Sequence, residues 1–138
     1  MNLQKAIFPL FILISFLFVS CSDDDNNEDD AQVLVTVVSD TGKLLPGEIV
    51  KMFDEKTYAE FEEDNQTNPT ASAETNSNGV ATFIITYAEW FKSNKDRFLT
   101  FAVQHGSAGN YTIWSSGSTI RPGSKIKIEL KLKALSNK

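Results

Sequence analysis

Residues 124–133 read SKIKIELKLK, the most regular stretch of the chain. Ile126, Ile128, Leu130 and Leu132 alternate there with lysines and one glutamate. Because successive side chains of a β-strand point to opposite faces of its sheet, the alternation predicts a strand with one apolar face on a core and one charged face in water. Lysines on an exposed strand discourage pairing with other chains, so we interpret the charged face as protection of a sheet edge.

Extended patterns of the same kind precede this strand and are separated by turns rich in glycine, asparagine and proline. They fall in residues 32–39, 48–53, 80–85, 98–104 and 111–115. Short strands between frequent turns are typical of an all-β domain. We therefore predict a mainly β fold, an antiparallel two-sheet sandwich of about seven strands.

Two segments between the strand patterns carry a signal for the start of a helix. Thr57 is followed three residues later by Glu60, and Thr86 by Glu89. In such a capping box, each of the two side chains bonds to the backbone N–H of the other residue. We expect one or two short helical turns at these places, packed on the sandwich.

Three turn sequences carry a resemblance to a known domain family. Residues 40–42 (DTG) follow the first expected strand, residues 45–47 (LPG) precede the second, and residues 75–79 (TNSNG) precede the third. In this order and spacing they resemble the transthyretin-like domains of the carboxypeptidase-regulatory group. The resemblance implies an Ig-like Greek-key sandwich and a module of a generally non-catalytic kind, although a fold does not fix a function.

The N-terminus has the layout of a secretory signal. Lys5 precedes an apolar run over residues 6–19, and Ser20 and Cys21 close the segment. A spanning helix needs about 20 apolar residues, and this run is shorter and is followed at once by acidic residues. We predict that residues 1–20 are a signal peptide that is removed.

Residues 18–21 (FVSC) resemble the lipobox of bacterial lipoproteins, in which an apolar residue stands three positions before an acylated cysteine. Cys21 is the only cysteine of the chain, which excludes an intramolecular disulfide. We expect Cys21 to carry the lipid that anchors the protein to a membrane, since two or more acyl chains anchor stably. A buried cysteine at the end of the signal segment is the alternative.

An acidic segment follows the cysteine. Residues 22–30 hold six acids and no apolar side chain, so we expect residues 21–31 to form a lipidated, solvated tether. The segment also resembles the export signal that sends some Gram-negative lipoproteins to the outer face of the outer membrane. We therefore expect a lipid-anchored outer-membrane protein facing the cell exterior.

Residues 32–138 have the size of a single domain. The chain holds 13 Lys+Arg and 18 Asp+Glu, and setting aside Lys5 and the six tether acids leaves 12 of each sign. A formally neutral domain lacks the cationic surface that nucleic-acid phosphates require, so we expect no nucleic-acid partner. Acids gather in residues 54–64 and bases in residues 121–138, which we interpret as two solvated faces.

Patterns typical of catalysis or metal binding are absent from the sequence. The single histidine, His105, has no second His or Cys with which to share a zinc ion. Residues 115–118 (SSGS) do not match the G-x-S-x-G pattern of a nucleophile elbow, which has a glycine two positions on either side of the serine. We expect His105 to be a solvated turn residue, and we predict no catalytic residues, no metal and no cofactor, hence no enzymatic activity.

Five aromatic side chains are the candidates for a ligand or partner surface. They are concentrated in the second half of the domain, near expected loops: Tyr87, Trp90, Phe91, Tyr111 and Trp114. Amphipathic rings are common at protein interfaces, and they suit stacking on sugar faces equally well. Packing in the core is the alternative role, because a small domain needs large rings there.

The leading hypothesis for function is a non-catalytic cell-surface lipoprotein that serves as a binding or accessory module for a glycan or a partner protein. It rests on the expected anchor, the tether and the lack of catalytic patterns. The alternative is a structural or assembly component of the outer envelope that pairs with a sibling protein through its sheet edges.

Overall fold

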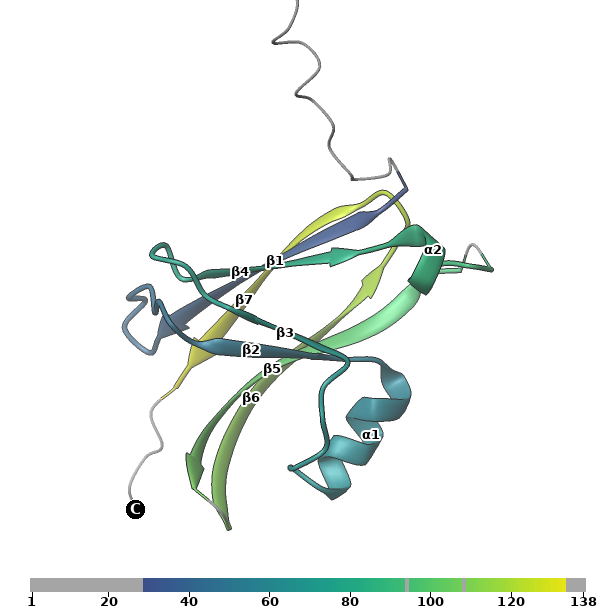
Figure 1. Ribbon diagram of the computed structural model, residues 1–138. Helices are drawn as coiled ribbons and strands as arrows, with labels where there is room; N and C mark the ends of the chain where they lie inside the picture. The colour runs from purple at the N-terminus through teal and green to yellow at the C-terminus, as the bar shows by residue number, and fades with distance from the viewer. Residues whose placement is uncertain (1–28, 94, 108, 134–138) are drawn as a thin grey trace, which may run out of the picture.

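The computed structural model describes residues 29–93, 95–107 and 109–133. In that part of the chain the protein is a mainly β sandwich of two sheets, as predicted (Figure 1). The elements in chain order are β1 (Ala31–Ser39), β2 (Ile49–Phe53), α1 (Glu55–Glu63), β3 (Ala71–Glu74), β4 (Val80–Ile85), α2 (Tyr87–Trp90), β5 (Arg97–Ser107), β6 (Asn110–Ile120) and β7 (Lys125–Leu132). The predicted signal peptide, Cys21 and most of the predicted tether lie outside the described residues. Among the described helices, none has the length and apolar character that a membrane span requires.

The strands form a three-stranded sheet in the order β4-β1-β7 and a four-stranded sheet in the order β3-β2-β5-β6. The β1–β7 pair is parallel, unlike the antiparallel pairing that we expected throughout. Both strands start at the same end of the sandwich, where the Gln32 N–H donates to the Ser124 carbonyl at 2.9 Å. Alternation along a single strand does not distinguish the two pairings, because both place every second side chain on one face.

The core lies between the inner faces of the two sheets. Val33 and Val35 of β1 are fully buried, as are Phe101 and Leu99 of β5. The strand over residues 124–133 behaves as predicted, with its apolar row turned inward and its charged row exposed. Period two therefore located the core-facing row of this strand correctly.

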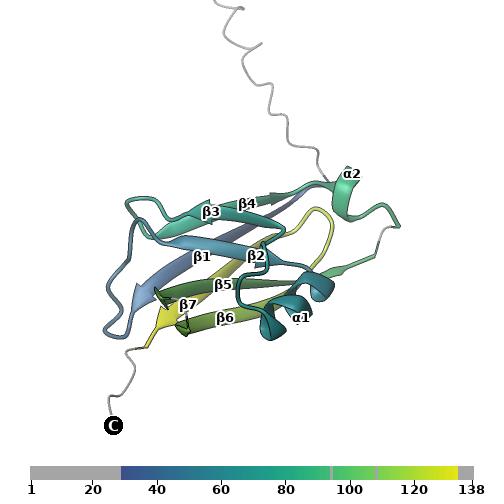
Figure 2. The ribbon, with the colours of Figure 1, turned by 60° about the horizontal axis from the view of Figure 1, so that its bottom comes forward.

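Helix α1 covers the outer face of the four-stranded sheet (Figure 2). The Phe61 ring stacks on Phe53 of β2 with centroids 4.5 Å apart, next to the buried Ala102 of β5. The helix begins one turn earlier than predicted. Asp54 is the N-cap residue, and Thr57 occupies the third helical position, so the capping box joins Asp54 and Thr57 in place of Thr57 and Glu60.

The side chain of Asp54 carries a pH-dependent part of the stability. Burial raises the pKa of Asp54, but hydrogen bonds from the Thr57 N–H and hydroxyl and the positive charge of Arg97 outweigh burial, so the pKa lies below its ordinary value of 3.8. A depressed pKa means that the ionised carboxylate stabilises the fold above about pH 3.8. This stabilisation is lost as the pH falls through the lowered value.

Replacing Asp54 by alanine is therefore expected to lower the free energy of unfolding by about 1 kcal/mol at neutral pH, a typical cost of losing an N-cap. The difference from the unmodified protein should shrink below about pH 3.8. Urea denaturation at a series of pH values measures it. Asp54→Asn is the control, because asparagine caps without titrating; a pH-independent difference for the alanine variant would contradict the assignment.

Two features of the fold were not predicted. Strand β3 has the sequence ASAE, whose inward row consists only of the small side chains Ala71 and Ala73, and it pairs with β2. Strand β6 continues to Ile120, well past the expected end at residue 115, and forms a long hairpin with β5.

At α2, Thr86 holds the predicted N-cap position but makes no capping bond through its side chain.

Candidate ligand-binding groove

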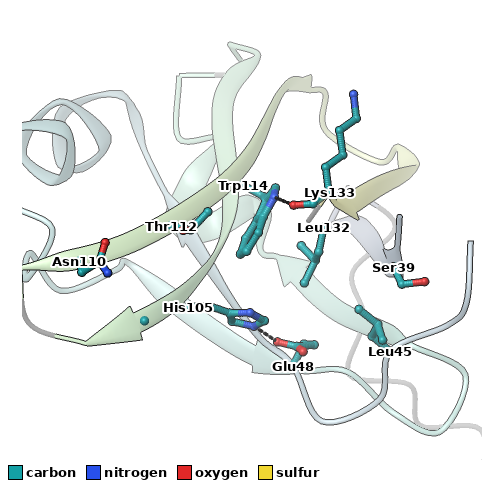
Figure 3. A pocket seen from close by; sticks show the side chains of 10 residues that line it. Ser39, Leu45, Glu48, His105, Asn110, Thr112, Trp114, Leu132 and Lys133 are labelled. Atoms are coloured by element: carbon teal, nitrogen blue, oxygen red, sulfur yellow. Dashed lines mark hydrogen bonds and ion pairs between the residues drawn. The ribbon is translucent and has the colours of Figure 1, made fainter. Parts of the chain in front are cut away.

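The inward-facing rows of β5 and β6 continue past the apolar core at one end of the sandwich. On β5 the buried Phe101 and Val103 are followed by His105 on the same face. On β6 Trp114 lies opposite Val103, and Thr112 lies opposite His105. Because alternate residues of a strand share a face, these polar and aromatic side chains extend the inner face beyond the core. They form one wall of a groove (Figure 3).

Glu48 faces His105 across the base of this groove. Strand β2 is antiparallel to β5, and the register that pairs Lys51 with Ala102 brings residue 48 opposite residue 105. His105 Nε2 lies 2.7 Å from Glu48 Oε2, within hydrogen-bond distance. The side chains of His105 and Glu48 are 46% and 21% exposed, so a ligand can reach both. His105 is exposed to solvent, as predicted, but the prediction that it lies in a turn is wrong, because β5 extends through it. Glu48, just before β2, is its carboxylate partner.

Trp114 is held in a defined orientation beside the pair. Its ring meets the His105 ring edge-on, with centroids 5.2 Å apart and an interplanar angle of 77°. Its Nε1–H donates to the Lys133 carbonyl at 3.3 Å, which ties β6 to the end of β7. Figure 3 shows the indole over His105 and next to Leu132. A ring fixed before the ligand arrives loses little conformational entropy on binding.

The groove has a volume of about 580 Å³, which is within the range of small-molecule sites. Its lining residues come from β1, β5, β6, the end of β7 and the segment before β2: Ser39, Leu45, Glu48, His105, Gly106, Asn110, Thr112, Trp114, Leu132 and Lys133. Apolar side chains therefore lie next to carboxylate, amide and hydroxyl groups. This mixture suits a ligand with both apolar faces and polar edges.

Thr75 positions the backbone that carries Glu48. Its side chain is almost fully buried. Its hydroxyl accepts from the Glu48 N–H at 2.8 Å and donates to the Leu45 carbonyl at 2.7 Å. The Thr75 N–H also donates to the Glu48 carbonyl at 2.8 Å. One buried threonine thus holds two groove residues in place.

The five aromatic candidates do not form one surface. Trp114 lines the groove. Tyr111 stands three positions away on β6, on the opposite face of the strand, and does not line the groove. Phe91 is fully buried, so its prediction as a ligand surface is wrong. The short helix α2 turns Phe91 into the core beside Tyr87, where the two ring centroids are 6.2 Å apart.

Trp90 lies at the other end of β5 from the groove. The Arg97 guanidinium lies over its ring, 5.2 Å from the centroid, and Arg97 Nη1 donates to the Trp90 carbonyl at 3.0 Å. Trp90 and Tyr87 both pack against the core. A cation covers the indole of Trp90, which therefore offers a ligand less free surface than Trp114.

Three groove residues, Glu48, Thr112 and Asn110, were not among the predicted site residues, and His105 was predicted in a turn. One signal was present: the alternation of residues 98–104, carried one step further, puts His105 on the core face. Nothing local marks Glu48, because its partner stands 57 positions away.

Comparison with known proteins bears on the fold alone. No protein-family model matches the chain, and no curated protein matches it. Among solved structures, the Bacillus anthracis TIE protein is similar with a TM-score of 0.51 and 15% identity, over 77% of this chain and 17% of that one. A catechol 1,2-dioxygenase of Acinetobacter radioresistens has a TM-score of 0.49 and 13% identity, over 84% of this chain and 55% of that one.

The chain thus spans about a sixth and about half of the length of these two proteins. At this identity the likeness to the TIE protein supports a β-sandwich-like fold and carries nothing about activity.

The groove offers stacking and hydrogen-bonding groups without a nucleophile paired to a base. The Ser39 hydroxyl lies 3.0 Å from the Thr41 hydroxyl and accepts from the Lys43 N–H, while His105 bonds to Glu48. A nucleophile–base pair is therefore not formed by these described side chains. Within the same described ranges, no group of three or more His, Cys, Asp or Glu side chains could hold a metal ion.

Proposed function

We propose that this protein is a non-catalytic, surface-displayed binding module whose groove holds a sugar ring of a glycan. In this proposal Cys21 carries the lipid, residues 22–30 form the tether, and the sandwich is of the transthyretin-like kind and faces the cell exterior from the outer membrane. The observation that carries the proposal is the fixed indole of Trp114 beside the Glu48–His105 pair.

A sugar ring has apolar C–H faces and hydroxyl edges, and the groove supplies a partner for each. The face of Trp114 suits stacking against C–H groups. The Glu48 carboxylate accepts hydrogen bonds from hydroxyls, and Asn110 and Thr112 can both donate and accept. No aromatic cage or buried cation competes with this assignment among the described lining residues.

The position of the groove agrees with a role at a surface. Strand β1 starts near α2, next to Asp29, and ends at Ser39 in the groove lining (Figure 1). At about 3.3 Å per residue, the nine residues of β1 separate its ends by about 26 Å. A chain anchored upstream of Asp29 would therefore present the groove at the end of the domain that lies away from its anchor.

Replacing Trp114 by alanine is expected to weaken binding to the recognised glycan at least about tenfold, as truncating a central tryptophan commonly does. Titration calorimetry on a panel of surface polysaccharides measures the loss. In a Trp90→Phe background, Trp114 is the only tryptophan, so its fluorescence reports binding at the groove directly.

The matched control is Ile113→Ala, because Ile113 is 38% exposed, precedes Trp114 on β6 and is not a groove residue. It should bind with unchanged affinity. Equal affinities of the Trp114→Ala variant and the unmodified protein would contradict the proposal. So would the absence of binding to every glycan, which would favour the assembly alternative.

A further inference from the structure

A row of lysines runs along the outer face of β7 and ends at the groove. Lys125, Lys127 and Lys131 are exposed at alternate positions of the strand, with Glu129 as the one acid among them. Lys133 continues the row and also lines the groove. Figure 3 shows the Lys133 side chain pointing away from the groove while its backbone carbonyl holds Trp114. The cationic row and the groove therefore meet at one residue.

The cations stand in single file. Strand β1 lies beside β7 in parallel register, and Gln32, Leu34 and Thr36 occupy its outward positions. On β4, the next strand, the exposed outward residues are Thr82 and Ile84. No cation lies on the outer face of either strand among these described residues. Outward positions of a strand are about 7 Å apart, so neighbouring lysines of the row are separated by about 7 Å, or by about 13 Å across Glu129. A single line of cations suits a linear polyanion laid along the strand, whereas a flat anionic membrane calls for cations spread across the sheet.

The row also lies on the opposite face of the sandwich from the acidic helix α1. Helix α1 packs on the outer face of the four-stranded sheet, and β7 is an edge strand of the three-stranded sheet. The acids of residues 55–63 therefore do not neutralise the lysines. The two charge clusters of the sequence thus become two separate faces in the structure.

Resting on the proposed glycan site, we infer that the recognised ligand is a linear acidic polysaccharide, with one sugar ring in the groove and the following anionic sugars along the β7 lysines. The groove supplies the ring recognition through Trp114 and Glu48. The lysine row supplies the preference for negative charge and a salt-sensitive part of the affinity.

The test compares acidic and neutral chains of the same backbone. The probes are oligogalacturonate with its methyl ester and carboxymethylated β-glucan with the unmodified glucan, titrated into the mature full chain. The unmodified protein should prefer an acidic member about tenfold in about 20 mM salt and lose most of the preference in about 300 mM salt. A triple variant, Lys125→Gln, Lys127→Gln and Lys131→Gln, should bind the acidic and the neutral member equally.

The matched control removes the same charge elsewhere, by Lys56→Gln, Lys92→Gln and Lys95→Gln, three exposed lysines outside β7. It should keep the preference. A preference that survives in the β7 variant, or that is lost equally in the control, overturns the inference while leaving the groove intact. Absence of binding to every acidic chain in low salt overturns it as well. Unchanged binding by Trp114→Ala overturns the proposed function itself, so the two failures are distinguishable.

Discussion

Replacing Phe101 by alanine is expected to lower the free energy of unfolding by about 3–5 kcal/mol, the usual range for a buried phenylalanine. Phe101 is fully buried at the centre of β5, and its ring meets Phe83 of β4 edge-on with centroids 5.2 Å apart. The pair joins the inner faces of the two sheets, so truncation leaves a cavity where both sheets lose contact. A domain of this size has about 5–15 kcal/mol in total, and the variant should be marginally stable.

Urea denaturation followed by circular dichroism measures the loss. Phe98→Ala is the matched control, because Phe98 lies on the same strand, points to the opposite face and is 43% exposed. It should cost less than about 1 kcal/mol, as for most exposed positions. Similar losses in the two variants would contradict the assignment of the inner and outer faces of β5.

Replacing Gly106 by alanine is expected to cost about 2–3 kcal/mol, the upper part of the range for a strained backbone position. Gly106 has a φ of +121°, which L side chains rarely adopt, and a Cβ there would stand 2.2 Å from the Asn110 carbonyl oxygen. The β5–β6 hairpin would have to open next to His105, so glycan affinity should fall together with stability.

Gly109→Ala in the same hairpin separates the two causes. Gly109 also has a positive φ, +84°, but a Cβ there would meet no atom within 4 Å. It should cost about 1 kcal/mol from backbone conformation alone. Thermal unfolding and glycan titration of both variants measure the difference, and equal effects would show that the Asn110 contact contributes nothing.

The strand positions followed from the sequence because period two is a local property. Alternation in residues 124–133 and 98–104 depends on the residues of one strand, and the structure places both rows as predicted. In strand β3 the inward row is only Ala71 and Ala73, a pattern too weak to indicate a strand, and its pairing with β2 defines it. The start of α1 was predicted one helical turn too late, at Thr57, because Asp54 is also a favourable N-cap residue and holds that position.

Of the five aromatic residues predicted for the site, one lies in the groove. Trp114 lines the groove, and the structure leaves it accessible. Phe91 is buried in the core, because the way α2 packs turns the residue that follows it inward. Trp90 was covered by Arg97, seven positions further along the chain, across a turn that local patterns do not determine.

The sequence by itself determined the places of six of the seven described strands, which face of the clearest ones turns inward, and that opposite charges gather in two segments. Tertiary structure alone decided that β1 and β7 run parallel, that Glu48 meets His105 across 57 positions, and that the β7 lysines end at the groove. The physical reason is that periodicity is set by neighbours along the chain, whereas a groove is set by the register and packing of strands far apart in it.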